Sequence, residues 1–110
     1  MGESKTGLLQ GTLDLLILKT LTRGAAHGWG IAQHIQRSSS DALEINQGSL
    51  YPALHRLEYK GWIVAKWGSS ENNRRAKFYE LTAGGRKQLA LENASWQAFS
   101  QAVNRVLQAT

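Results

Sequence analysis

The chain has 110 residues, which fits one domain with a modest hydrophobic core. A hydrophobic fraction of 42% is typical of a folded protein, and a formal net charge of +5 suits a polyanion such as nucleic acid or an anionic membrane surface. The absence of cysteine excludes a disulfide scaffold, a cysteine-ligated zinc site and thiol catalysis.

The sequence shows no targeting or membrane-spanning segment. Residues 1–7 carry Glu3 and Lys5 and have no apolar core, so we expect no signal peptide there. The longest apolar run, from Leu15 to Leu18, is far shorter than a transmembrane span. We therefore expect a soluble protein of the cytoplasm.

Two helices are expected in the first third of the chain. The first runs from Thr12, a suitable N-cap, to about Leu21, and its wide stripe of leucine and isoleucine predicts burial on several sides. The second runs from about His27 to Ser38, with two glycines near its start where close packing or a tight turn is needed. A short strand is expected over 42–45.

A third helix is expected over 47–60, because its leucines recur at spacings of four and three on one face. Pro52 is acceptable in a first turn, so the helix should begin near Gly48 or Ser49. The helical wheel then predicts five residues on the outer face: Ser49, Pro52, His55, Arg56 and Tyr59. A donor-rich face at a helix N-terminus can enter the major groove of DNA, although an ordinary solvated face has the same pattern.

A β-hairpin is expected next, with strands over 62–67 and 76–81 and a polar turn over 68–73. Its cations are Lys66, Arg74, Arg75 and Lys77, against the single acid Glu71, so four cations and one acid give +3. A cationic hairpin beside a recognition helix favours contact with a DNA backbone or minor groove. The alternative is a tip that only aids solubility.

The last expected helix begins after Thr82 as its cap and runs to about residue 108. Its apolar stripe comprises Leu89, Trp96, Phe99, Val103 and Leu107 (or Val106), with Glu92 at the one position that is not apolar. A chain of this size has little else to cover such a stripe, so a second copy is the economical partner. A dimer would also place two recognition helices on two half-sites.

The order of these elements predicts a mainly α fold with a small β-wing, a winged helix-turn-helix followed by one long helix. Residues 1–82 would form the DNA-binding domain. Residues 83–110 would form a C-terminal dimerisation helix within the same compact domain.

The segments 47–61 and 73–86 resemble the recognition helix and the wing-to-helix junction of the PadR family of bacterial regulators. The first contains the pattern Leu-Tyr-Pro-x-Leu-x-x-Leu-Glu intact, and the second ends in Ala-Gly-Gly-Arg, which accounts for two glycines that periodicity leaves unexplained. Segments 11–14 and 27–31 also fit, so the resemblance spans nearly the whole chain. With one helix after the wing, the chain is similar to the short subfamily.

This resemblance implies a sequence-specific DNA-binding regulator, in most cases a repressor, acting as a homodimer on a pseudo-palindromic operator. It implies DNA contacts by recognition-helix residues and by wing cations: Ser49, Tyr51, Pro52, His55, Arg74, Arg75 and Lys77. The Tyr51 ring would pack beside the core while its hydroxyl reaches a phosphate. Arg56, on the predicted outer face, is added to this set.

The resemblance also implies an alternative function at Trp96. In short members that bind flat aromatic drugs, a Trp in a Ser-Trp context of the last helix lines a pore at the dimer centre, and Ser95-Trp96 stands in that context here. Two such rings could hold an aromatic effector whose binding releases DNA. The simpler interpretation is that Trp96 fills the dimer core, because Phe99 nearby would crowd a pore.

Catalysis and metal binding are not expected. His27 and His34 lie seven residues apart without a nearby carboxylate or cysteine, and Asp14, Glu44 and Glu58 form no pattern for acid–base chemistry. We therefore expect a non-enzyme without a cofactor. A third alternative, a winged helix that binds only protein, is disfavoured by the intact wing cations.

Overall fold

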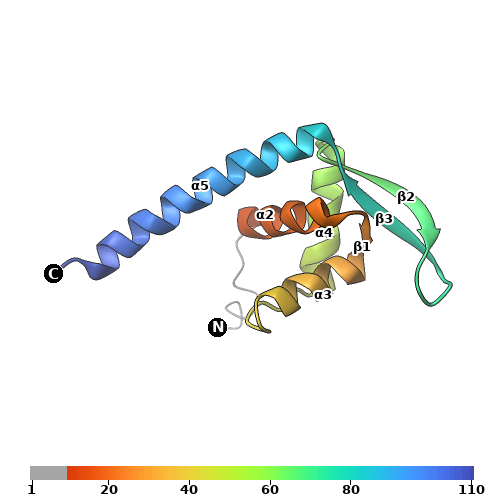
Figure 1. Ribbon diagram of the computed structural model, residues 1–110, viewed down its shortest axis with the longest axis horizontal. Coiled ribbons are helices and arrows are strands. Elements are labelled where there is room, and N and C mark those ends of the chain that lie inside the picture. The colour runs from red at the N-terminus through yellow and green to blue at the C-terminus, as the bar shows by residue number, and fades with distance from the viewer. Residues whose placement is uncertain (1–9) are drawn as a thin grey trace.

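The computed structural model describes residues 10–110 (Figure 1). The segment 1–7, for which the sequence predicts no signal peptide, lies outside these residues. In chain order the elements are α2 (Gln10–Thr20), the 3-10 turn η1 (Leu21–Arg23), β1 (Ala26–His27), α3 (Gly28–Ser38), α4 (Gln47–Tyr59), β2 (Ile63–Ser69), β3 (Arg75–Leu81) and α5 (Ala83–Gln108). This mainly helical fold with a small antiparallel sheet confirms the predicted fold class.

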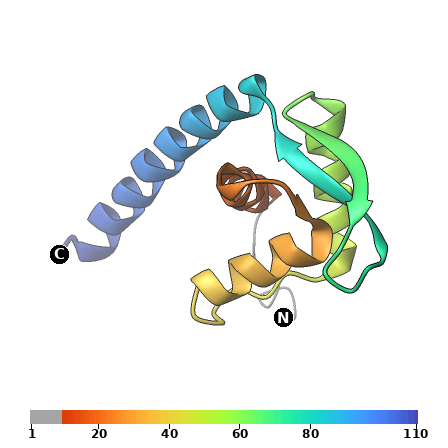
Figure 2. The ribbon, with the colours of Figure 1, turned by 45° about the vertical axis from the view of Figure 1, so that its right-hand side comes forward.

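Helix α2 lies at the centre of the molecule and contacts α3, α4 and α5 (Figure 2). Ile17 and Leu18 are fully buried, as the wide apolar stripe predicts. The prediction that Thr12 caps this helix is wrong, because α2 already includes Gln10. Gln10 and Gly11 carry no apolar side chain, so the periodic pattern could not reveal this part of the helix.

Helix α4 begins at Gln47, as the predicted range has it, and one or two residues before the start inferred from Pro52. Asn46 is its N-cap, and the Asn46 Oδ1 accepts a hydrogen bond from the Ser49 N–H at 2.9 Å. Pro52 therefore lies in the second turn, and the Gly48 carbonyl lacks the donor that residue 52 supplies in a regular helix. The inner face follows the prediction, since all three of its leucines are buried: Leu50, Leu54 and Leu57.

The sheet has the strand order β1-β3-β2 and is antiparallel throughout. The predicted hairpin is confirmed, with register from Ile63 opposite Leu81 to Ser69 opposite Arg75. Strand β1 is missed by the sequence, because two residues are too few to show alternation.

The strand expected over 42–45 is absent, and that prediction is wrong. Leu43 and Ile45 alternate with exposed Ala42 and Glu44, yet they pack against the core from an irregular loop. Alternation reports which side chains point inward, and a strand also needs a neighbour with which to form hydrogen bonds.

The start of α5 explains the paired glycines. The Thr82 Oγ1 accepts a hydrogen bond from the Gly85 N–H at 3.0 Å, as expected of an N-cap. Gly85 is buried, and a Cβ at this position would collide with the Trp62 carbonyl oxygen and come within 2.9 Å of the Leu81 Cδ1. Gly85 thus lets the helix begin directly against the hairpin.

The molecule is elongated, with principal extents of 56 × 31 × 21 Å. Helix α5 and the β2–β3 hairpin, the wing, project from opposite sides of the body formed by α2, α3 and α4 (Figures 1 and 2). The wing and the far end of α5 therefore lie at opposite ends of the molecule.

Candidate nucleic-acid interface

A groove of about 640 Å³ lies between α4, the start of α3 and the wing; we call it the wing groove. Its lining residues are His27, Gly28, Trp29, Tyr51, His55, Trp67, Ser70, Glu71, Asn72, Arg74, Arg75, Ala76, Lys77 and Tyr79. The structure thus brings together α4 and the cationic wing, the two elements that the sequence predicts to contact DNA.

The strand register explains which wing residues face α4. Ile63 and Tyr79 are buried, so they define the inner face of the hairpin. Side chains alternate along a strand, and Trp67 pairs with Lys77 on this same face. Arg75, two residues before Lys77, follows on the inner face toward the tip. The core-facing side of the hairpin therefore continues outward as the cationic wall of the groove.

Ion pairs constrain some wing cations more than others. The Lys77 Nζ lies 3.9 Å from the Glu58 Oε1 of α4. On the outer face, the Lys66 Nζ lies 3.2 Å from the Glu80 Oε1. Within residues 10–110, neither Arg74 nor Arg75 is paired with a carboxylate. These two guanidinium groups carry the uncompensated positive charge of the wing.

The turn of the wing is closed by its own hydrogen bonds. The Asn73 N–H donates to the Ser70 carbonyl at 2.8 Å, the Ser70 N–H donates to the Arg74 carbonyl at 2.8 Å, and the Arg74 N–H donates to the Ser70 Oγ at 3.3 Å. Asn73 adopts a φ of 59°, a left-handed conformation that Asn tolerates better than most residues. The turn is therefore organised, although the sequence predicts only a polar tip.

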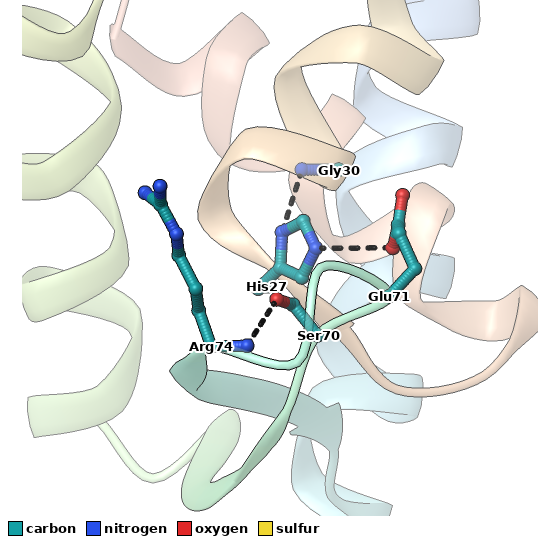
Figure 3. A network of polar contacts seen from close by, with 5 residues as sticks. All are labelled: His27, Gly30, Ser70, Glu71 and Arg74. Atoms are coloured by element: carbon teal, nitrogen blue, oxygen red, sulfur yellow. Dashed lines mark hydrogen bonds and ion pairs between the residues drawn. The ribbon is translucent and has the colours of Figure 1, made fainter.

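His27 connects this turn to α3 (Figure 3). Its Nδ1 accepts a hydrogen bond from the Gly30 N–H at 3.0 Å and so caps α3, while its Nε2 lies 4.0 Å from the Glu71 Oε1. The ring also packs edge-on against Phe78, with centroids 5.3 Å apart. His27 has no sequence signal for this role, because Glu71 and Phe78 are distant in the chain.

Tyr51 packs more closely than the sequence predicts. A Cβ at Gly28 would lie 2.7 Å from the Tyr51 Oη, so the hydroxyl end of the ring rests on the first residue of α3. The side chain is still 38% exposed. Burial raises the pKa of the neighbouring Tyr79, and the charges of Glu58 and Tyr51 raise it further.

The exposure of α4 agrees with the predicted outer face except at one residue. Ser49, Pro52, His55 and Tyr59 are exposed. Arg56 is not free on this face: its Nη2 donates to the Asp14 Oδ1 at 2.7 Å, and its Nε is buried without a partner in the described part of the chain.

This pair corrects the predicted placement of Arg56, which points toward α2. The wheel treats every polar residue outside the leucine stripe as exposed, and it cannot anticipate a carboxylate presented by another helix. Asp14 is only 8% exposed while the Arg56 side chain is 31% exposed, so the pair ties α2 to α4 at the border of the interior.

The α5 stripe, as we call Leu89, Trp96, Phe99, Val103 and Leu107, is mostly uncovered. Leu89 packs against the core of its own chain, whereas the other four side chains are exposed. Two hollows, of about 490 and 690 Å³, lie between α2 and α5, and Trp96 lines both. The Trp96 and Phe99 ring centroids are 6.2 Å apart, so Phe99 crowds one side of Trp96.

Neither a metal centre nor a membrane span is found in residues 10–110. No three His, Asp or Glu side chains gather there into a possible metal site, and no helix there has the length and apolarity to cross a bilayer. His34 instead bonds the Arg23 Nη1 at 2.9 Å and the Ser38 Oγ at 3.1 Å. Burial and the charges of Arg23 and Arg37 lower the pKa of His34.

Comparison with known proteins agrees with this arrangement. Residues 17–91 match the model of a family described as the transcriptional regulator PadR-like family. A protein of Lysinibacillus sphaericus, described as uncharacterized, is 25% identical over 100 residues, covering 91% of this chain and 92% of its own.

Two solved structures illustrate the similarity in fold. A transcriptional regulator from Clostridium thermocellum superposes with a TM-score of 0.80 at 28% identity, over 87% of this chain and 93% of its own. A PadR-like transcriptional regulator from Bacillus cereus superposes with a TM-score of 0.79 at 26% identity, over 94% of this chain and 99% of its own.

Proposed function

Because this chain belongs to the PadR-like transcriptional regulator family, whose members bind DNA, we propose that it is a sequence-specific repressor acting as a homodimer on a pseudo-palindromic operator. The observation that carries the proposal is the wing groove, in which α4 and the cationic wing face one another. The proposal places the protein in the cytoplasm and assigns it no catalytic role and no cofactor.

In this proposal α4 enters the major groove, and its N-terminal half reads base edges. Ser49 in that half and His55 just beyond it are exposed donors that carry the sequence preference. Tyr51 and Pro52 lie between them and shape the contact surface. Tyr51 is restricted to a nearby phosphate, because its hydroxyl end is already packed on Gly28.

The wing cations contact the sugar-phosphate backbone. Arg74 and Arg75 are exposed and without a carboxylate partner in residues 10–110, whereas the charge of Lys77 is partly compensated by Glu58. Arg56 is removed from the contact set, since its guanidinium holds α4 against α2 through Asp14. We expect these backbone contacts to be independent of base sequence.

The α5 stripe pairs with that of a second copy. The division predicted from the sequence follows, with residues 1–82 binding DNA and residues 83–110 forming the dimerisation helix. Support comes from four large apolar side chains exposed along one helix, a pattern that marks an interaction surface.

The proposal is tested by gel shift with duplexes covering the region upstream of the protein's own gene, at several salt concentrations. We expect specific binding whose logarithmic affinity falls linearly with the logarithm of the salt concentration. Equal affinity for the upstream region and for unrelated DNA would contradict sequence-specific repression.

An aromatic-ligand sensor is the alternative function, and one observation favours it. The two hollows between α2 and α5 share Trp96, which is 41% exposed, and the larger hollow is lined mainly by apolar side chains. A planar aromatic compound bound there would change the packing of α5 and hence the spacing of the two recognition helices.

This alternative is tested by titrating planar aromatic dyes into the wild-type protein and into Trp96→Ala. The chain has four Trp residues, so quenching alone is ambiguous and the variant is the necessary control. Dye binding that the variant loses, together with weaker operator binding in the presence of dye, supports a sensor. Equal binding by both proteins assigns Trp96 to the dimer core.

A further inference from the structure

Trp67 is an exposed aromatic residue in the wing groove that the roles assigned so far leave unexplained. It is 60% exposed, although it lies on the inner face of the hairpin, where Ile63 and Tyr79 are buried. The Arg75 guanidinium lies over its ring at 4.4 Å from the centroid. Trp67 thus covers little of the core, and its nearest interaction is with a candidate DNA-contacting cation.

The strand register makes this contact a diagonal one. Trp67 pairs with Lys77, and Arg75 pairs with Ser69, so Arg75 is the diagonal neighbour of Trp67 across the hairpin. Diagonal neighbours on one face of an antiparallel pair are within reach of large side chains. The register of β2 and β3 therefore places the Arg75 side chain within stacking reach of Trp67.

We propose that Trp67 is a positioning residue for DNA binding, which holds the Arg75 guanidinium ready to bind one phosphate in the wing groove. The proposal rests on the proposed function. The Arg75 guanidinium lies over the face of the Trp67 ring, and an indole ring takes up none of its N–H donors as a carboxylate would, so they stay available to phosphate oxygens. An arginine ordered in this way loses less side-chain entropy when it binds.

Arg74 is the natural comparison within the same wing. It is also exposed and unpaired with a carboxylate in the described residues, but no aromatic ring there stacks on it. We therefore expect Arg74 to contribute to DNA binding independently of Trp67. Arg75 should contribute only when Trp67 is present.

The test measures operator affinity against salt concentration for four proteins: wild type, Trp67→Leu, Arg75→Ala and the double variant. The operator is selected from random duplexes by the wild-type protein. Each single variant should lose, for each protomer bound to the operator, about tenfold in affinity and about one unit of salt slope, as expected for one lost charge-assisted phosphate contact per wing. The double variant should lose no more than either single variant.

The salt slope distinguishes a positioning role for Trp67 from a packing role. Trp67→Leu removes no charge, so a lower slope in this variant means that a cation has lost its phosphate contact. If Trp67 only packs against DNA or the wing, Trp67→Leu lowers affinity but keeps the wild-type slope. Trp29→Leu is the matched control, since Trp29 is an exposed groove residue with no stacked cation in the described chain. It should keep the wild-type slope, and Trp67→Phe should recover most of the slope that Trp67→Leu loses.

Two results overturn the proposal: a wild-type slope for Trp67→Leu, or additive losses in the double variant, near a hundredfold for each bound protomer. Circular dichroism and thermal melting confirm that each variant is folded, which is expected for an exposed position. Failure of the proposed function is distinct, because the wild-type protein would then select no operator from the random duplexes.

Discussion

The wing groove and the α5 stripe both expose large aromatic side chains, yet their surroundings differ. In the groove, Trp67 and Tyr51 lie among the uncompensated charges of Arg74 and Arg75. On α5, the exposed neighbours of Trp96 along the stripe are apolar. An aromatic surface mixed with cations fits a polyanion, whereas an apolar surface fits a partner that removes it from water.

The two surfaces also differ in how they are held. The wing is attached to the body through the sheet, through His27 and through the ion pair between Lys77 and Glu58. Beyond Leu89 the side chains of α5 are mostly exposed, and the C-terminal end of the helix projects away from the body (Figure 1). The groove is therefore formed within one chain, while we expect the stripe to require a second copy for its stability.

The largest effect is expected from substitutions that disrupt the α5 stripe. Replacing Phe99 and Val103 together with glutamate places two charges in the proposed apolar seam, which disfavours association strongly. We expect a monomer by sedimentation and a loss of operator affinity of at least about a hundredfold, because the two half-sites are no longer bound together. A variant that remains dimeric would place the interface elsewhere, and Gln97→Glu, on an exposed position outside the stripe, is the control.

The next-largest effect is expected at the junction where α5 meets the wing. Gly85→Ala introduces a Cβ that collides with the Trp62 carbonyl oxygen, so α5 must shift relative to the hairpin. We expect a loss of about 1–3 kcal/mol in the free energy of unfolding, measured by denaturant titration.

Gly84→Ala is the matched control for this substitution. A Cβ there would meet its nearest heavy atom at 3.7 Å, an ordinary contact. Because alanine favours a helix over glycine by about 1 kcal/mol, we expect Gly84→Ala to be neutral or stabilising. Equal destabilisation by both substitutions would show that the collision at Gly85 is not the cause.

The smallest effects separate cations that bind DNA from one that supports the fold. Arg74→Ala should lower the salt slope by about one unit and affinity by about tenfold for each bound protomer, without changing the melting temperature. Lys77→Ala should have a weaker effect, because Glu58 already engages this lysine.

Arg56→Met should behave in the opposite way. It leaves the nearly buried Asp14 carboxylate without its partner, so we expect a loss of about 1–3 kcal/mol in stability and an unchanged salt slope. A lowered slope with unchanged stability would return Arg56 to the DNA-contact set. These measurements use the same operator and salt series as the wing variants.

Several particular features could be predicted from the sequence because their causes are local. The leucines of α4 recur with the helical period, the hairpin alternates on either side of a polar turn, and Thr82 precedes a long periodic segment. The contact between α4 and the wing could also be predicted, since a hairpin that follows a helix after a short connection usually packs beside it.

Other features could not be predicted, because they depend on residues that are distant in the chain. Arg56 meets Asp14 across 42 positions, and His27 meets both Phe78 and Glu71. The two-residue β1 exists only because β3 offers it an edge. Loop 42–45 carries the alternation of a strand but has no such edge.

The sequence by itself determined the order of the helices and of the hairpin, the apolar faces of α2 and α4 and the positive charge of the wing, because periodicity and charge are properties of short segments. Only the tertiary structure decided which polar side chains are free to act. The Arg56 guanidinium is paired with the nearly buried carboxylate of Asp14. The Arg75 guanidinium lies over the Trp67 ring, which the strand register places within its reach. The physical reason is that a side chain's availability depends on the partners that folding brings to it.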